Sequence, residues 1–213
     1  MRQARPSRFA PPDERRRYGR MLRRVAPRSR VSRFEPRPKR DVVTPWLAAN
    51  ASRYLPRLLP VKYGRMAASP FAFFRGTAAI MASDLASLGA AGIEVQVCGD
   101  AHVRNLGAYA APDGHVVFDI NDFDETTRGP FEWDLARLAA SFVLAGREAG
   151  NRDAVSREAV TTLARAYREG LERFSALPAI ELARYEIRRH LEAGPVHDVA
   201  RVAPVPQRVV PRH

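Results

Sequence analysis

The chain has 213 residues, 46% of them hydrophobic, which is enough for a domain of ordinary size with a core of its own. No run approaches the roughly 20 consecutive apolar residues of a membrane-spanning helix, and a single cysteine, Cys98, excludes an internal disulfide bond. The formal net charge of +12 belongs to residues 1–40, which hold 15 basic and three acidic side chains, while the remainder holds 20 of each sign. Because no apolar secretory segment follows the arginine-rich start, these features favour a cytoplasmic protein.

The N-terminal arm is rich in arginine and proline. Residues 1–40 show no regular apolar period, which predicts a disordered basic arm with a short helix at residues 13–25. Clustered arginines bind phosphate chains and release their counterions, so nucleic acid or an anionic surface is one candidate partner of this arm. A solvated arm without a partner is the alternative, because no recognised binding motif accompanies the charge.

The next segment predicts two helices with a strand between them. Thr44 and Pro45 are typical of a helix start within residues 41–59, and Pro56 and Pro60 would end that helix. The aromatic residues at 71–74 predict a short strand with alternate side chains in a core. A helix is expected over residues 77–88, with four buried positions: Ala79, Met81, Leu85 and Leu88.

A strand over residues 95–98 and a loop over residues 99–105 are expected next. The turn signal at residues 112–114 then predicts a β-hairpin with arms at residues 106–110 and 115–120. Gly129-Pro130 is expected to break the chain before three helices at residues 131–149, 152–177 and 180–193. The core would therefore span residues 41–195, between the basic arm and a proline-rich tail at residues 196–213.

Three polar residues follow one another at intervals that suit phosphoryl transfer. Asp100 could accept or orient the proton of an attacking hydroxyl, Asn105 could hold a metal ion, and Asp122 could bridge that metal to nucleotide phosphates. Asp119 competes with Asp122, but it lies within an apolar strand, whereas Asp122 follows the strand's end. Asp124 is a candidate second ligand, and neighbouring carboxylates favour Mg²⁺.

The strings around these residues resemble a known pattern. GDAHVRN at residues 99–105 is similar to the catalytic loop of aminoglycoside phosphotransferases and other protein-kinase-like enzymes, and DFD at residues 122–124 is similar to their metal-binding motif. This resemblance implies that Asp100 is catalytic and that Asp134, in a following WDLA string, supports the loop. His102 would contact substrate or metal, or it would fix the loop by a hydrogen bond.

A closer resemblance covers residues 57–149. Four blocks in one order, among them VCGDAHVRNLG at residues 97–107 and PFEWDLARLAASFVLA at residues 130–145, resemble a bacterial family called domain of unknown function 2252. Members of that family are longer, with a Gly-rich, Lys-containing segment beyond the part that this chain matches. The resemblance therefore implies a truncated chain.

The sequence departs from the kinase pattern in three respects. Cys98 stands where such kinases often have a histidine, and neither GxGxxG nor GxxxxGK occurs. Lys62 is the one lysine near the expected core, so it is the candidate phosphate-binding lysine. Arg65 or Arg75 could bind phosphate instead, because a guanidinium matches two phosphate oxygens at once. Arg75 could equally form an ion pair with one of the acidic residues.

The sequence thus predicts an α+β protein with a partial protein-kinase-like core, mostly the helical lobe with its catalytic hairpin. The predicted activity is Mg²⁺- and ATP-dependent phosphoryl transfer to a hydroxyl of an unknown small-molecule or protein acceptor. The alternative is a truncated, inactive nucleotide-binding or scaffold remnant of such a protein. The GDAH string also suits a two-metal phosphoesterase, but the other four histidines are scattered and make that hypothesis weaker.

Overall fold

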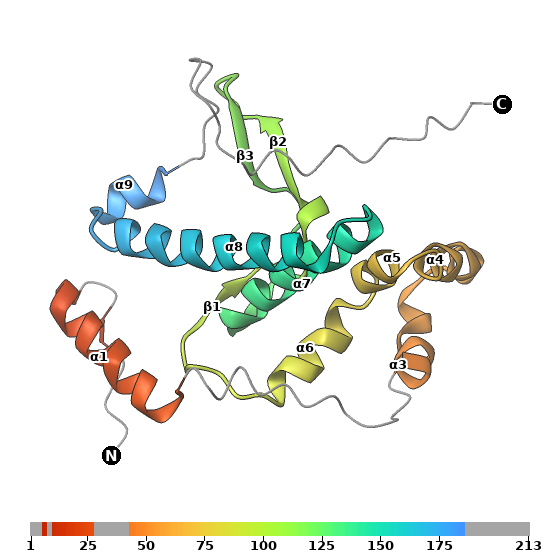
Figure 1. Ribbon diagram of the computed structural model, residues 1–213, viewed down its shortest axis with the longest axis horizontal. Helices are drawn as coiled ribbons and strands as arrows, with labels where there is room; N and C mark the ends of the chain where they lie inside the picture. Colours follow the sequence, from red (N-terminus) through yellow and green to blue (C-terminus); the bar gives the residue numbers. More distant parts are fainter. Residues whose placement is uncertain (1–5, 8–9, 28–42, 186–213) are drawn as a thin grey trace.

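The computed structural model describes residues 6–7, 10–27 and 43–185, and within them it is an α+β protein, as predicted (Figure 1). The helices are α1 (Pro12–Val25), α3 (Val43–Asn50), α4 (Leu59–Met66), α5 (Pro70–Arg75), α6 (Ala78–Ala86), α7 (Glu132–Glu148), α8 (Asp153–Phe174) and α9 (Ala179–Ala183). The strands are β1 (Glu94–Val97), β2 (Leu106–Ala110), β3 (Val116–Ile120) and β4 (Thr127–Pro130). Short 3-10 turns occupy residues 51–53, 56–58 and 103–105.

The helices α7 and α8 form the centre of the described structure. The chain reverses at residues 149–152, so the two helices run back along each other (Figure 1). They approach closely where Gly146 faces Ser156, because a Cβ at position 146 would collide with the Ser156 hydroxyl. The helix α5 packs on α7 from another side. This central pair therefore carries the segments on which the candidate site is built.

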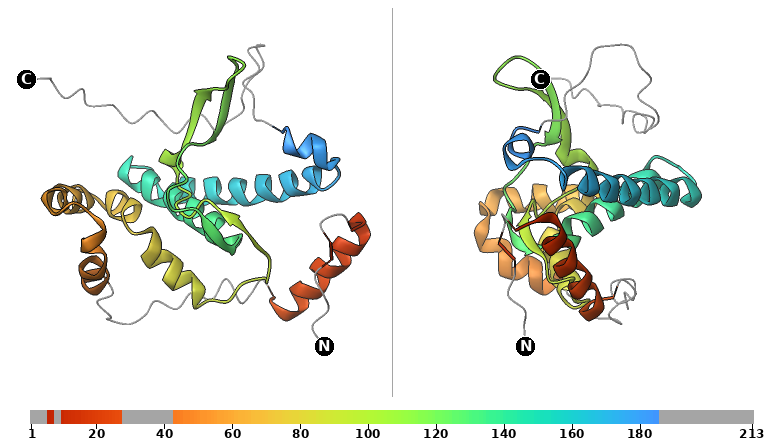
Figure 2. Two further views of the ribbon diagram at one scale, coloured as in Figure 1. Left: turned by 180° about the vertical axis from the view of Figure 1, so that it is seen from behind. Right: turned by 90° about the vertical axis from the view of Figure 1, so that its left-hand side faces the viewer.

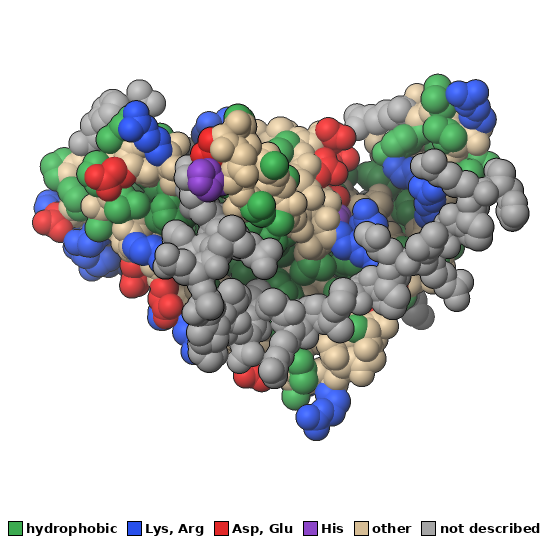
Figure 3. Space-filling view, turned by 90° about the horizontal axis from the view of Figure 1, so that it is seen from above, with side chains coloured by type: hydrophobic (Ala, Val, Ile, Leu, Met, Phe, Trp, Pro, Cys, Tyr) green, Lys and Arg blue, Asp and Glu red, His purple; other side chains and the backbone are tan. Residues whose placement is uncertain are grey.

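The predicted hairpin is present. Strands β2 and β3 pair antiparallel from Leu106 opposite Ile120 to Ala110 opposite Val116, and Gly114 adopts the positive φ of 84° that its turn requires. The hairpin projects beyond the helices in all views (Figures 1 and 2). Seen from above, the face toward which it points exposes hydrophobic side chains between charged ones (Figure 3).

The second sheet was not expected from the sequence. Gly129-Pro130, predicted to break the chain, belongs to β4, which pairs antiparallel with β1. Pro130 is the last residue of the strand, opposite Glu94, where a missing N–H is tolerated. Pro130 therefore ends β4, whereas Gly129 is part of the strand and pairs with Val95.

The predicted strand at residues 71–74 is wrong, because these residues form the helix α5. The Ser69 hydroxyl accepts a hydrogen bond from the Ala72 N–H at 3.1 Å, and Pro70 opens the helix. The Phe71 and Phe74 rings stack at 6.4 Å between centroids, as residues three apart on a helix can do. The spacing of the aromatic residues fits both a strand and a helix, whereas the Ser69-Pro70 cap is specific to a helix start.

Other boundaries also differ. The helix expected within residues 41–59 ends at Asn50, and Pro60 lies in the first turn of α4 where it was expected to end a helix. The helix α6 confirms the prediction for residues 77–88, although none of its residues is fully buried and Ala79 is exposed. The helices α7 and α8 match the predictions for residues 131–149 and 152–177.

At the two ends of the chain the comparison is partial. The helix α1 agrees with the short helix expected at residues 13–25, and α9 ends at Ala183, earlier than the helix expected at residues 180–193. The rest of that helix, the tail at residues 196–213 and the arm at residues 28–40 lie outside the described residues. Among the helices that the structure describes, none is long and apolar enough to cross a membrane.

Among the described residues, half of the fully buried side chains are polar or charged. Fully buried apolar residues are Met66, Phe71, Val97, Cys98, Ala101 and Val117, and the buried polar or charged ones are Thr77, His102, Asn105, Arg137, Ser141 and Ser156. A polar side chain is costly to bury unless it is hydrogen-bonded. Most of the polar set gathers around the loop that follows β1, which makes this loop the candidate site.

Candidate functional site

The loop after β1 is held at its start by one carboxylate. Asp134, in the first turn of α7, accepts hydrogen bonds from the Cys98 N–H at 2.6 Å and the Gly99 N–H at 3.0 Å. Gly99 has a positive φ of 87°, and a Cβ there would collide with the Glu125 carbonyl. The WDLA string thus supplies the contact that supports the loop, and the GD string supplies the glycine that the contact needs.

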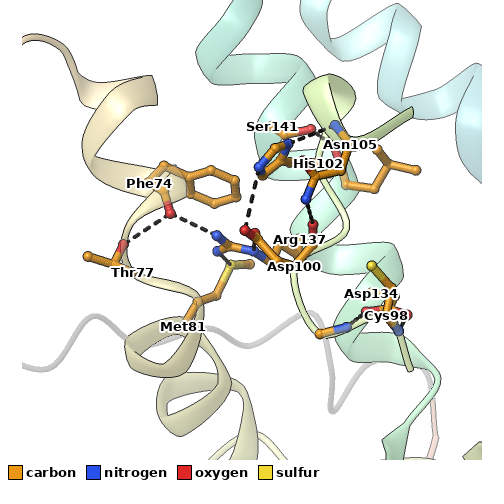
Figure 4. A network of polar contacts seen from close by, with 12 residues as sticks. Phe74, Thr77, Met81, Cys98, Asp100, His102, Asn105, Asp134, Arg137 and Ser141 are labelled. Carbon is orange, nitrogen blue, oxygen red and sulfur yellow. Dashed lines mark hydrogen bonds and ion pairs between the residues drawn. The ribbon is translucent and has the colours of Figure 1, made fainter. Parts of the chain in front are cut away.

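Asp100 lies between a guanidinium and an imidazole (Figure 4). The Arg137 Nε donates to Asp100 Oδ1 at 2.6 Å, and His102 Nε2 lies 3.5 Å from Asp100 Oδ2. Burial alone would raise the pKa of Asp100, but the His102 hydrogen bond and the Arg137 charge outweigh it, so the pKa is lowered. Asp100 is therefore a carboxylate anion at neutral pH.

His102 and Asn105 are fixed by the same loop. The Asn105 N–H donates to His102 Nδ1 at 3.2 Å, so the proton of the neutral ring lies on Nε2, the atom that faces Asp100. The Asn105 Nδ2 donates to the Asp100 carbonyl at 3.0 Å. Of the two roles predicted for His102, the structure contains the contacts of the loop-fixing one; contact with a substrate or a metal is not tested.

The amide of Asn105 therefore has a defined direction. Its nitrogen is used in the bond to the Asp100 carbonyl, and no donor in the described part of the chain contacts its oxygen. A hydrogen-bonded amide nitrogen leaves the oxygen as the atom that can bind a cation. Asn105 also bonds the hairpin through its carbonyl, which accepts from the Asn121 N–H at 3.0 Å.

Asp122 lies beside the loop but is exposed. The Cys98 thiol donates to the Asp122 carbonyl at 3.4 Å, while Asp122 Oδ1 accepts from the Asp124 N–H at 3.2 Å in a local turn. Asp119 and Asp124 are exposed as well. Within the ranges that the structure describes, no three His, Cys, Asp or Glu side chains form a cluster that could hold a metal ion. Any metal there would need ligands besides these carboxylates.

The surroundings of Cys98 raise the pKa of its thiol. Burial raises the pKa of its thiol most, and the carboxylates of Asp134, Asp100 and Asp122 raise it further, against a hydrogen bond from the Asp100 backbone that lowers it. Two of these acids also contact Cys98 directly, Asp134 through the Cys98 N–H and Asp122 through its backbone carbonyl. Because its pKa is raised, the Cys98 thiol is neutral at neutral pH.

For the two predicted phosphate-binding cations, Lys62 and Arg75, no described contact joins the side chain to this network. Lys62 Nζ lies 3.4 Å from the centroid of the Tyr54 ring, so its described contact is with the segment before α4. Arg75 ends α5 and is exposed, and no described acidic side chain forms an ion pair with it. Of the two alternatives for Arg75, the described contacts do not include the ion pair with a site acid; the arginine that pairs with Asp100 is Arg137.

Sequence reasoning missed Arg137 and Ser141, which the fold brings to the loop from α7. The Ser141 hydroxyl accepts from the Val103 N–H at 3.1 Å and donates to the Leu138 carbonyl at 2.7 Å. Both side chains are buried, and they are four residues apart on one helix face. A signal was present: an arginine and a serine recur at helical spacing within the apolar run that follows Asp134.

A pocket of about 230 Å³ lies beside Arg137 and is also lined by Gly99, the first residue of the loop. Its wall is mostly apolar and includes Met81 and Leu85 of α6, Val97 of β1 and Trp133 of α7. The face of α6 that was predicted to be buried therefore borders an open pocket.

The fold and site together define an α+β protein with a buried polar loop braced by one helix. A family model described as "Uncharacterized protein conserved in bacteria (DUF2252)" matches residues 53–204, and the chain belongs to this family. The match includes the loop, Asp134 and Arg137, and it confirms the family predicted from the four sequence blocks. No curated protein and no solved structure matches the chain. The kinase-like fold and its chemistry stay predictions.

Proposed function

We propose that this protein transfers a phosphoryl group from ATP, with Mg²⁺, to a hydroxyl of a small-molecule or protein acceptor, on a kinase-like helical lobe. The observation that carries the proposal is the hydrogen bond from Asn105 Nδ2 to the Asp100 carbonyl at 3.0 Å. It ties a candidate metal ligand to the candidate catalytic residue and leaves the amide oxygen available. Catalysis of phosphoryl transfer depends mainly on such positioning and on charge stabilisation.

Asp100 would orient the attacking hydroxyl. Its lowered pKa makes it a weak base, but a loose phosphoryl-transfer transition state requires little proton abstraction at the start. The bonds from Arg137 and His102 leave other lone pairs on the carboxylate, and the side chain keeps some exposure. Asp134 would contribute by holding the loop backbone and His102 by holding Asp100 and Asn105.

The donor set suits magnesium. Asn105 offers an amide oxygen, and Asp122 offers Oδ2, which no donor in the described residues contacts; Asp124 would be a second carboxylate ligand. Mg²⁺ prefers oxygen ligands and usually keeps several waters beside one or two carboxylates and substrate phosphates, so a three-acid cage is not required. When bound, the ion would neutralise charge on the transferred group.

A nucleotide also needs a cation for its phosphates. Arg75 is the side chain we assign to this role, because its guanidinium is exposed and pairs with no described acid. Lys62 would have to leave the Tyr54 ring to take part.

That contact of Lys62 favours the second candidate, an inactive nucleotide-binding or scaffold protein. Both candidates require a stable fold, and either could bind a nucleotide with its metal ion. They differ in turnover, which only the enzyme shows. ATP hydrolysis with water as acceptor, measured on the wild type and on Asp100→Asn, separates them. A rate lost in Asp100→Asn supports the enzyme, and binding without any turnover supports the remnant.

The test of the site itself is thermal unfolding of the full chain with and without ATP and Mg²⁺. Ligand at about 100 times its dissociation constant should stabilise by about 2.7 kcal/mol, enough to raise the midpoint by a few degrees. The rise should be lost in Asp122→Asn and kept in Asp119→Asn, an exposed aspartate three residues earlier, on β3. No rise in the wild type, or an equal rise in Asp122→Asn, would overturn the proposal.

A further inference from the structure

Arg137 is a buried cation with four described contacts. It is 2% exposed and lies on α7, three residues after Asp134. Its Nε donates to Asp100 Oδ1 at 2.6 Å, its Nη2 to the Phe74 carbonyl at 2.8 Å and its Nη1 to Met81 Sδ at 3.6 Å. The guanidinium carbon also lies 4.1 Å from the Phe74 ring centroid. A buried guanidinium needs such partners, because its charge is costly to remove from water.

We propose that Arg137 is the positioning residue of Asp100: it holds Oδ1 and thereby presents Oδ2 as the oxygen that faces a reacting hydroxyl. For its chemical meaning the inference rests on the proposed phosphoryl transfer. The contact distances support the assignment, since the Arg137 bond to Oδ1 is short and the approach of His102 Nε2 to Oδ2 is long, at 3.5 Å. Each oxygen already has one partner, and the longer contact is the one to Oδ2, so a further donor competes less at Oδ2 than at Oδ1.

The geometry of the guanidinium explains why an arginine stands here. Its plane is fixed at three nitrogens and by the ring of Phe74, so the direction of the Nε–H bond is fixed as well (Figure 4). A lysine would bring the same charge as a single point, without the planar set of donors that sets the carboxylate's orientation. A charge alone would keep Asp100 ionised but would not fix the orientation of its carboxylate.

The same contacts link Asp100 to helices earlier in the chain. The Phe74 carbonyl closes α5 and Met81 lies on α6, so both helices help to hold the guanidinium that holds Asp100. The position of the loop carboxylate therefore depends on α5, α6 and α7 together. Asp134 and Ser141 fix the loop backbone, whereas Arg137 fixes the side chain.

The decisive variant is Arg137→Lys, which keeps the charge and removes the fork. Its matched control is Arg147→Lys on the same helix, where Arg147 pairs with Asp153 at 3.0 Å at the surface. Two quantities are measured on the full chain: the titration of the Asp100 side-chain carboxyl by NMR, and the kcat and KM of Mg²⁺-dependent ATP hydrolysis. In Arg137→Lys we expect the Asp100 titration to move upward and kcat to fall by about 10²-fold with KM unchanged, as a misplaced catalytic group does.

Each outcome decides one of the two proposals. Unchanged titration and unchanged kcat in Arg137→Lys, as in the control, would overturn the positioning role. Absence of ATP hydrolysis in the wild type overturns phosphoryl transfer, while the titration still decides whether Arg137 holds Asp100. If Arg137→Lys does not fold, Phe74→Leu removes the ring beneath the guanidinium and keeps the Phe74 carbonyl. It should shift the Asp100 titration in the same direction by less, and no shift would count against the proposal.

Discussion

Two arginines of α7, Arg137 and Arg147, each pair with an aspartate from another segment, and the two pairs have the same chemistry and different surroundings. Arg137 Nε lies 2.6 Å from Asp100 Oδ1, with side chains 3% and 17% exposed, and Arg147 Nε lies 3.0 Å from Asp153 Oδ1, with side chains 58% and 52% exposed. By their N···O distances alone, the two ion pairs would be expected to contribute similarly to stability. Burial separates them, because water screens the surface pair, while the inner pair cannot lose one partner without leaving a charge in the interior.

The two carboxylates also reach a lowered pKa by different routes. At Asp153 the Arg147 hydrogen bond and charge are the main causes, and little burial opposes them. At Asp100 burial is the largest influence and acts in the opposite direction, so His102 and Arg137 must outweigh it. A lowered pKa by itself therefore does not mark a functional carboxylate, whereas a lowered pKa in a buried, multiply bonded one is informative.

Removing the buried cation should have the largest effect. Arg137→Met leaves the Asp100 carboxylate without its cation, and we expect a loss of about 3–5 kcal/mol in the free energy of unfolding, from urea denaturation. Arg147→Met is the control and should leave the urea midpoint unchanged. Equal midpoints for the two variants would show that burial does not separate the pairs.

The support of the loop should come next. Asp134→Ala removes the acceptor of the Cys98 and Gly99 N–H groups, which should cost roughly 1–3 kcal/mol of stability. Asp134→Asn keeps one acceptor oxygen and should lose less. Faster hydrogen exchange at Cys98 and Gly99 in Asp134→Ala would locate the change in the loop, and unchanged exchange there would contradict the bracing role.

A smaller effect is expected at Ser141. In Ser141→Ala the Val103 N–H loses its acceptor, and we expect a loss of about 1 kcal/mol. Ser175 is a matched control, because its hydroxyl also donates to the carbonyl three residues earlier at 2.7 Å, but at the surface. Ser175→Ala should leave the unfolding curve unchanged; an equal loss would point to the helix-internal bond instead of the loop bond.

The smallest expected effects are in the titrations. Because the folded pKa of Asp100 lies below its unfolded value, its contribution to stability is full above about pH 3.9 and is lost as the pH falls through the folded pKa. The stabilities of the wild type and Asp100→Asn should therefore converge in acid. In 1 M NaCl the pKa of Asp153 should return toward its ordinary value while that of Asp100 changes little. Equal salt responses by NMR would remove the distinction between the pairs.

The predictions from sequence succeeded where the signal was local. Pro112-Asp113-Gly114 specifies a tight turn whatever the rest of the chain does, and the hairpin formed with the expected arms. The helix at residues 131–149 was predicted from its apolar period. At residues 71–74 the strand prediction is wrong because a four-residue aromatic run fits both strand and helix, and the Ser69 cap selects the helix.

The sequence did not predict strand β4, because the signal for this strand is not local. It exists because β1 lies beside it, with Val95 opposite Gly129, and a partner 34 residues earlier in the chain is invisible in local composition. Lys62 and Arg75 are cations close to the predicted core in the sequence. That closeness does not show where their side chains lie, and Lys62 contacts Tyr54.

What the sequence by itself determined is the loop: Gly99 permits its turn, and Asp100 and Asn105 are close enough along the chain to bond each other. The tertiary structure decided what holds that loop. Arg137 and Ser141 reach it from a helix more than 30 residues later, and only the packing of α5 and α6 against α7 buries the guanidinium and gives its charge a single carboxylate to hold. Sequence spacing encodes neighbours along the chain, whereas burial and partner choice depend on which distant surfaces meet.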